Sequence, residues 1–134
     1  MSSSSLHLTD SDLRRLRALV DADLRTRTTA TLETLHGKLT HAVVTEPSAL
    51  PPDFVTLGSF VKIEDIYTGE VEEYTLTYPE QADIGSCRLS VLSPVGAALL
   101  GAREGGIVDW PTPGGIRRLK VHRVTQPALA GAED

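Results

Sequence analysis

The sequence predicts an α+β protein in which two amphipathic helices precede a small, mostly antiparallel β-sheet with one short inserted helix. Three observations predict this class. Apolar residues recur every three or four positions up to residue 46, a proline-rich segment covers 47–53, and apolar residues alternate with polar ones from residue 54 onward. We therefore expect an antiparallel helical hairpin over residues 1–46, a linker over 47–53 and a sheet domain over 54–134.

The first helix is predicted to begin at Thr9, because Thr9 and Asp12 form an approximate capping box. Residues 25–28 break the helical period, and Pro47 stops the second helix. The two apolar stripes comprise Leu13, Leu16, Val20 and Leu24 in the first helix, and Leu32, Leu35, Leu39 and Val43 in the second. Two such helices joined by a short turn pack antiparallel.

Five strands are predicted after the linker, which its prolines should keep extended. They cover residues 59–66, 71–78, 87–92, 107–110 and 116–124, with a turn at 111–115 between the last two. In the third strand Cys87, Leu89 and Val91 should face the core, with Cys87 packed as a small buried residue. Ser93 should cap the short helix that follows, which begins with Pro94 and ends at Gly101.

Composition restricts the function. The net charge of the 134 residues is −5 and aromatic residues make up 4%, which argues against direct, sequence-specific nucleic-acid binding and against an aromatic ligand pocket. One cysteine excludes an internal disulfide, and residues 1–5 lack the features of a signal peptide. We expect a cytoplasmic monomer with no membrane span, a disordered start at 1–5 and a frayed tail at 126–134.

Two groups of charged residues are candidate sites. Asp21, Asp23, Arg25 and Arg27 should lie at the end of the hairpin, and Arg118, Lys120 and His122 should line the outer face of an edge-like last strand. Arg14, Arg15 and Arg17 of the first helix, together with Arg25 and Arg27, form either a partner-contact surface or a solvated face. His7, His36 and His41 have no metal-binding spacing, and no catalytic motif, cofactor site or metal site is recognised.

The run from Ser90 to Gly101, Ser-Val-Leu-Ser-Pro-Val-Gly-Ala-Ala-Leu-Leu-Gly, resembles the C-terminal domain of Gre-type transcript cleavage factors. It is most similar to the Rnk branch of this superfamily, the regulators of nucleoside diphosphate kinase. Supporting segments are Pro51–Ser59, Val61–Lys62, Gly69–Val71, Leu76–Pro79 and Trp110–Gly115. The resemblance implies an FKBP-like sheet domain, a short coiled-coil hairpin and RNA polymerase as the partner.

The hairpin end departs from the pattern of the cleavage factors. Those factors hold a catalytic magnesium near an Asp and a Glu three residues apart, followed by Asn, whereas this chain has Asp21 and Asp23 two apart. Such residues point about 200° apart on a helix and would not converge on one ion. Gly106 also stands where related domains often have Asp. The resemblance thus implies a non-enzymatic regulator of the Rnk type that docks near the polymerase secondary channel without cleaving transcripts.

Two other functions stay open. Fold analogy alone suggests an FKBP-like prolyl isomerase or chaperone domain, which needs a deep aromatic pocket. The available aromatic residues are Phe54, Phe60, Tyr67, Tyr74, Tyr78 and Trp110, several of which the core should use. The family name suggests an effect on nucleotide metabolism, but no nucleotide-binding motif is present. We expect such an effect to act through gene expression.

Overall fold

The computed structural model describes residues 6–112 and 114–126. Its elements in chain order are β1 (His7–Leu8), α1 (Asp10–Leu24), α2 (Ala30–Thr40), β2 (Val43–Val44), the 3-10 turn η1 (Pro47–Ala49), β3 (Phe60–Asp65), β4 (Val71–Thr77), η2 (Pro79–Gln81), η3 (Ile84–Ser86), β5 (Arg88–Ser90), α3 (Pro94–Leu99), β6 (Ile107–Thr112) and β7 (Gly115–Thr125). The segments expected to be disordered lie outside the described residues, except Gln126. The Gln126 amide donates to the Phe54 carbonyl at 2.7 Å, so the frayed tail cannot begin at this residue.

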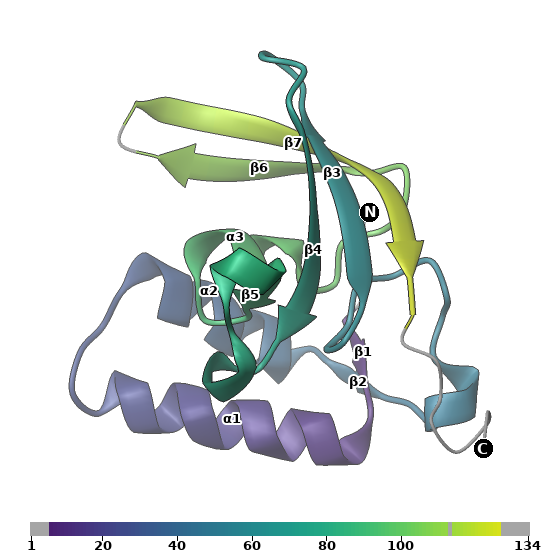
Figure 1. Cartoon of the computed structure of the whole chain (residues 1–134). Coiled ribbons are helices and arrows are strands. Elements are labelled where there is room, and N and C mark those ends of the chain that lie inside the picture. Colours follow the sequence, from purple (N-terminus) through teal and green to yellow (C-terminus); the bar gives the residue numbers. More distant parts are fainter. Residues whose placement is uncertain (1–5, 113, 127–134) are drawn as a thin grey trace.

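Five strands form one sheet in the spatial order β5-β4-β3-β7-β6. The pairings are antiparallel except the parallel pair β4–β5. The short helix α3 packs between α2 and β6, and α1 and α2 lie together at one end of the molecule (Figure 1). The predicted mixed class, with five strands and one short helix after the third, is confirmed. Among the described residues, no helix has the length and apolar character needed to cross a membrane.

Both N-terminal helices begin at a threonine cap. Thr9 Oγ1 accepts a hydrogen bond from the Asp12 amide at 3.2 Å, and Thr29 Oγ1 accepts one from the Leu32 amide at 3.1 Å. The predicted stripes are buried at Leu13, Leu16, Val20, Leu32, Leu35 and Leu39. The helical pair predicted from the spacing of apolar residues is therefore present.

The second helix ends earlier than the apolar spacing predicts. α2 stops at Thr40, and Val43 lies in β2 with 44% of its surface exposed. β2 pairs in parallel with β1, since the Val43 amide donates to the Leu6 carbonyl at 2.8 Å. β-branched valines favour this extended pairing over a further helical turn.

The helices and the sheet share one core. Leu16 and Leu35 of the helical pair belong to the same buried cluster as Val61 of β3 and Leu119 of β7. Between them, the expected linker is not extended throughout, because η1 forms a 3-10 turn at Pro47–Ala49. The division into parts at residues 46 and 54 stays a prediction.

The strand and helix around the Ser90–Gly101 run form, but the strand covers only Arg88–Ser90 of the predicted 87–92. Ser93 Oγ accepts from the Gly96 amide at 3.1 Å, and Gly101 ends the helix with φ +86°. Cys87, however, is exposed and left-handed with φ 59°, because the turn η3 ends on it. The strand therefore begins one residue later, at Arg88, and the prediction of a buried Cys87 was wrong.

β7 is an interior strand. It lies between β3 and β6, so the edges of the sheet are β5 and β6, and the edge-like position predicted for the last strand was wrong. Alternation along one strand identifies its two faces but not its neighbours. The turn before β7 is also shorter than the predicted 111–115, since β6 extends to Thr112 and β7 begins at Gly115.

Candidate functional site

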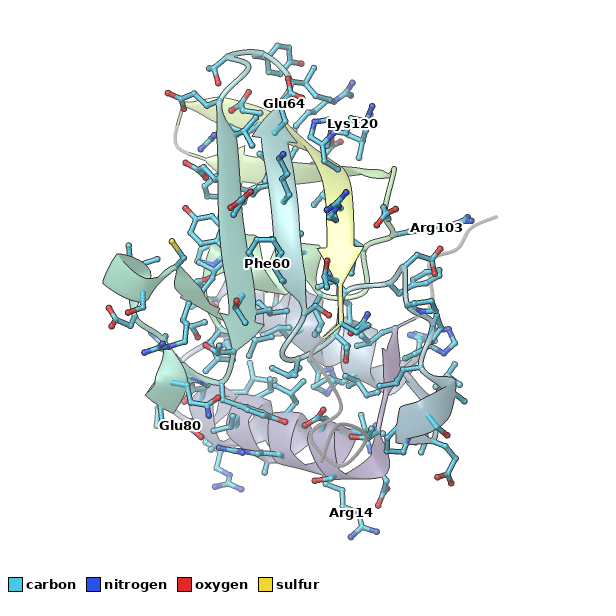
Figure 2. The ribbon with its side chains drawn as sticks, turned by 45° about the vertical axis from the view of Figure 1, so that its right-hand side comes forward. Arg14, Phe60, Glu64, Glu80, Arg103 and Lys120 are labelled. Carbon is cyan, nitrogen blue, oxygen red and sulfur yellow. The ribbon has the colours of Figure 1, made fainter. Side chains whose placement is uncertain are left out.

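One face of the sheet packs toward α3 and the core, and the opposite face, called the outer face here, carries charge. On β7, Leu119 and Val121 are buried whereas Arg118, Lys120 and His122 are exposed, as the alternation predicts. Lys120 pairs in register with Glu64 of β3. Figure 2 shows Glu64 and Lys120 together at the end of the sheet farthest from α1.

Neighbouring acids contact two of the three predicted docking residues. Arg118 Nε lies 3.2 Å from Asp109 Oδ1, and His122 Nε2 lies 2.5 Å from Glu64 Oε1. Lys120 has no ion pair within residues 6–112 and 114–126. The structure thus places Arg118, Lys120 and His122 on one face but leaves only Lys120 uncompensated.

Two further cations on this face were not selected from the sequence. Lys62 of β3 stands directly opposite Arg123 of β7, and neither has an ion-pair partner in the described part of the chain. Directly opposed like charges destabilise a sheet unless another group compensates them, and Glu73 of β4 stands opposite Lys62 on its other side. We call Lys62, Lys120 and Arg123 the basic face.

A β-bulge explains why Arg123 was missed. The register between β3 and β7 shifts at Lys62 and Ile63, so that Arg123 is exposed while Val124 is 93% buried. Strict alternation from Lys120 would place Arg123 on the inner side and Val124 on the outer side. Only the hydrogen-bond register reveals the shift.

The end of the helical hairpin is closed by its own contacts. The Asp23 carbonyl accepts from the amides of Thr26 and Arg27, both at 3.1 Å, and the Asp23 carboxylate lies 3.5 Å from the Arg27 guanidinium. Asp21 and Arg25 are exposed or partly exposed and have no ion pair among the described residues. Within those residues, no group of three or more His, Cys, Asp or Glu side chains gathers as a metal site would require.

The arginines of α1 have structural partners. Arg14 pairs with Asp10 at 3.1 Å, Arg17 donates to the Leu39 carbonyl at 3.2 Å, and Arg15 pairs with Glu80. These contacts connect α1 to itself, to α2 and to the turn after β4. The three side chains therefore do not form a set of unpaired charges.

Tyr78, at the end of β4, joins the sheet to α1. Its hydroxyl donates to the Asp12 carboxylate, and the Arg15 guanidinium lies 3.8 Å from the centre of its ring. Burial and the Asp12 carboxylate raise the pKa of the Tyr78 phenol. Local sequence patterns could not identify these partners, because Asp12 and Arg15 lie 66 and 63 positions away from Tyr78 in the chain.

The aromatic side chains do not line one deep pocket. Tyr67 is 71% exposed in the β3–β4 turn, and Phe54 packs edge-on against His7 at the other end of the sheet. Tyr74 and Trp110 share a cavity of about 190 Å³, smaller than the roughly 300–1,000 Å³ of ordinary ligand pockets. No observation here favours a prolyl isomerase site.

The chain is similar to proteins of known families. The family model described as "Transcription elongation factor, GreA/GreB, C-term" matches residues 50–126. The regulator of nucleoside diphosphate kinase of Escherichia coli (strain K12) is 41% identical over 101 residues, which cover 74% of each chain. Transcription elongation factor GreA of Clostridium botulinum (strain Alaska E43 / Type E3) is 41% identical over 87 residues, 65% of this chain and 54% of that protein.

Among solved structures, "Prokaryotic transcription elongation factor GreA/GreB from Nitrosomonas europaea" superposes with a TM-score of 0.76 and 32% identity. The match covers 92% of this chain and 99% of that one. The resemblance expected from the Ser90–Gly101 run is confirmed, and the named relatives are regulators and elongation factors. The chain belongs to the GreA/GreB transcription elongation factor family, together with the regulators of nucleoside diphosphate kinase.

Proposed function

We propose that this chain is a transcription regulator of the Rnk type that binds RNA polymerase near its secondary channel and does not stimulate transcript cleavage. The polymerase is its partner, and it acts as a monomer in the cytoplasm without an enzymatic activity, cofactor or metal of its own. Any effect on nucleoside diphosphate kinase levels is indirect, through transcription.

The observation that carries the proposal is the basic face. Lys62, Lys120 and Arg123 lie inside the region that matches the GreA/GreB C-terminal model, on a sheet face free of helices. These three cations have no ion pair among the described residues, although Glu73 and Glu64 stand opposite Lys62 and Lys120 in register. On a chain of net charge −5, such cations favour contact with an acidic surface. Arg118 and His122 belong to the same surface but contribute less, because Arg118 is paired with Asp109 and His122 already contacts Glu64.

The end of the hairpin supports the proposal that the chain does not stimulate transcript cleavage. Asp23 is paired with Arg27, and Asp21 lies two residues away on a helix, where it points in another direction. These two carboxylates do not form the converging pair that would hold a catalytic magnesium. We propose that Asp21, Asp23, Arg25 and Arg27 contact the polymerase channel without delivering a metal ion.

The proposed units are those predicted from the sequence. Residues 1–46 form a short coiled-coil hairpin, 47–53 connect it, and 54–134 form an FKBP-like docking domain. α1 has 15 residues and α2 has 11, so the longer arm spans about 22 Å. A hairpin of this length reaches only a short way past the surface on which the sheet docks.

Two assays test this function. Immobilised RNA polymerase should retain the chain under conditions in which a Gre factor binds. Stalled elongation complexes should show no transcript cleavage above background when the chain is added with magnesium, while a Gre factor stimulates it. Lack of retention would refute polymerase binding, and cleavage would refute the non-cleaving class.

A further inference from the structure

Lys38, in the last turn of α2, binds the C-terminal end of α3. Its Nζ donates to the carbonyls of Ala97, Ala98 and Leu100 at 2.7, 3.2 and 2.7 Å. The last carbonyls of a helix have no partner within the helix, and the helix dipole favours a cation there. One ammonium group therefore satisfies three acceptors of the short helix α3.

Besides Lys38, α2 meets the sheet domain through Leu32, Leu35 and Leu39, which belong to the shared buried cluster. Lys38 lines two grooves, one of about 660 Å³ beside Gly37 and His41 and one of about 380 Å³ beside Thr31 and Thr34. Close packing would leave no such space between α2, α3 and β6. Among the described residues, the hydrogen bonds of the Lys38 side chain are thus the polar link between α2 and α3.

α1 is held in a different way. Asp12 and Arg15 both contact Tyr78 at the end of β4, and Arg15 also pairs with Glu80. These three contacts involve α1, whereas Lys38 belongs to α2. α2 has no comparable tie apart from Lys38 among the described residues.

We propose that Lys38 is a positioning residue that sets the angle between the α1–α2 hairpin and the sheet domain. Without its ammonium group, α2 can move away from α3 while α1 stays attached through Tyr78. The consequence for function rests on the proposed polymerase binding, because a hairpin must point in one direction to enter a channel while the sheet is docked.

The test measures the angle directly in the free chain. Nitroxide labels at Thr28→Cys, in the turn between α1 and α2, and at Glu73→Cys, on the sheet, report one distance in a Cys87→Ser background. All three positions are exposed. Pulsed electron resonance should give one narrow distribution for the parent, and Lys38→Met should broaden it at least twofold or shift its maximum.

Two control variants separate positioning from general stability. Lys38→Arg keeps a cation that can reach the α3 carbonyls and should restore a narrow distribution. Leu35→Ala weakens the helical core but leaves the Lys38 contacts intact, so its distribution should also stay narrow. A Lys38→Met distribution as narrow as the parent's, or equal broadening by Leu35→Ala, would overturn the proposal.

A second measurement serves if Lys38→Met does not fold. The unmodified chain has three lysines, Lys38, Lys62 and Lys120, so acetylation followed by mass spectrometry compares their rates within one molecule. Burial lowers the pKa of Lys38 to about 8, which makes its amine the more reactive one at pH 8.5. The contacts to α3 nevertheless predict acetylation at least tenfold slower than at Lys120, and an equal rate would refute them.

The measured hairpin position can be distinguished from polymerase binding. The distance is measured without polymerase, so it stands even if the chain binds none. If polymerase does retain the chain, Lys38→Met should still be retained within about twofold through the basic face, but it should lose the effect on transcription. Full regulation by a variant with a broadened distribution would show that the hairpin angle has no role.

Discussion

Gly96 lies where α3 passes closest to β5. A Cβ atom there would come 2.0 Å from the Ser90 carbonyl oxygen, which belongs to the backbone and cannot rotate away. Gly96→Ala should therefore cost about 1–3 kcal/mol in the free energy of unfolding. Urea unfolding followed by circular dichroism measures this loss.

Gly37 provides the matched control. It lies inside α2 and a Cβ atom there would meet nothing within 4 Å. Gly37→Ala should raise the free energy of unfolding by about 0.5–1 kcal/mol, because alanine loses less backbone entropy in a helix. The two identical substitutions should thus have opposite signs, and equal losses would show that the contact at Gly96 is not the cause.

Lys38 makes stability depend on pH above neutrality. Burial lowers its pKa from 10.5 to about 8 in the folded chain. Between these values the unfolded chain holds a proton that the folded chain lacks, so the free energy of unfolding rises with pH. Tyr78 acts in the opposite direction above pH 10, since its pKa is raised. Chemical unfolding from pH 8 to 10 should show the free energy of unfolding rising in the parent but not in Lys38→Met. Equal dependence on pH in the two proteins would contradict the role of Lys38.

At the level of elements, the helical pair and the sheet should unfold together because they share one buried cluster. Trp110, the single tryptophan, lies in β6 and reports on the sheet, whereas ellipticity at 222 nm is dominated by the helices. The two signals should give the same urea midpoint in the parent. In Leu35→Ala the two midpoints should fall together. The free energy of unfolding should drop by about 2–5 kcal/mol, because Leu35 is fully buried.

Separate midpoints would contradict the shared core and favour two independent domains with boundaries at 46 and 54. They would also make the hairpin a unit that can be removed without unfolding the sheet. Coincident midpoints leave the proposed parts as functional units within one cooperative structure.

Elements with local signals could be predicted from the sequence. The threonine cap at Thr9, the Ser93 cap and the glycine at Gly101 act within four residues of themselves, and apolar periodicity placed both helical stripes. Features that depend on distant partners could not be predicted. Val43 left the helix because β1 lies beside it, and β7 became interior because β6 pairs with its free side.

The same distinction applies to the candidate site. Alternation placed Lys120 on the outer face, but it could not show that Arg118 pairs with Asp109 or that His122 contacts Glu64. Lys62 and Arg123 required the bulged register between β3 and β7. Lys38 was missed for a similar reason, since its acceptors are 59 to 62 positions away in the chain.

For the whole molecule, charge on the basic face should decide polymerase affinity. Lys120→Glu combined with Arg123→Glu should weaken binding about tenfold or more, equal to a loss of at least about 1.4 kcal/mol. Arg118→Ala, which removes a cation already paired with Asp109, should change it less than threefold. Equilibrium binding of the two variants to purified polymerase, at two salt concentrations, measures these effects. An equal loss of affinity in the two variants would mean that net charge rather than this face matters.

The central claim is that this chain occupies the site on RNA polymerase that Gre factors use, without their cleavage activity. Competition tests it most directly: stalled complexes cleaving with a fixed amount of GreA are titrated with the chain. Cleavage should fall to background as the chain displaces GreA, and the Lys120→Glu, Arg123→Glu variant should need about tenfold more protein for the same effect. Unchanged cleavage at saturating chain, or increased cleavage, would contradict it.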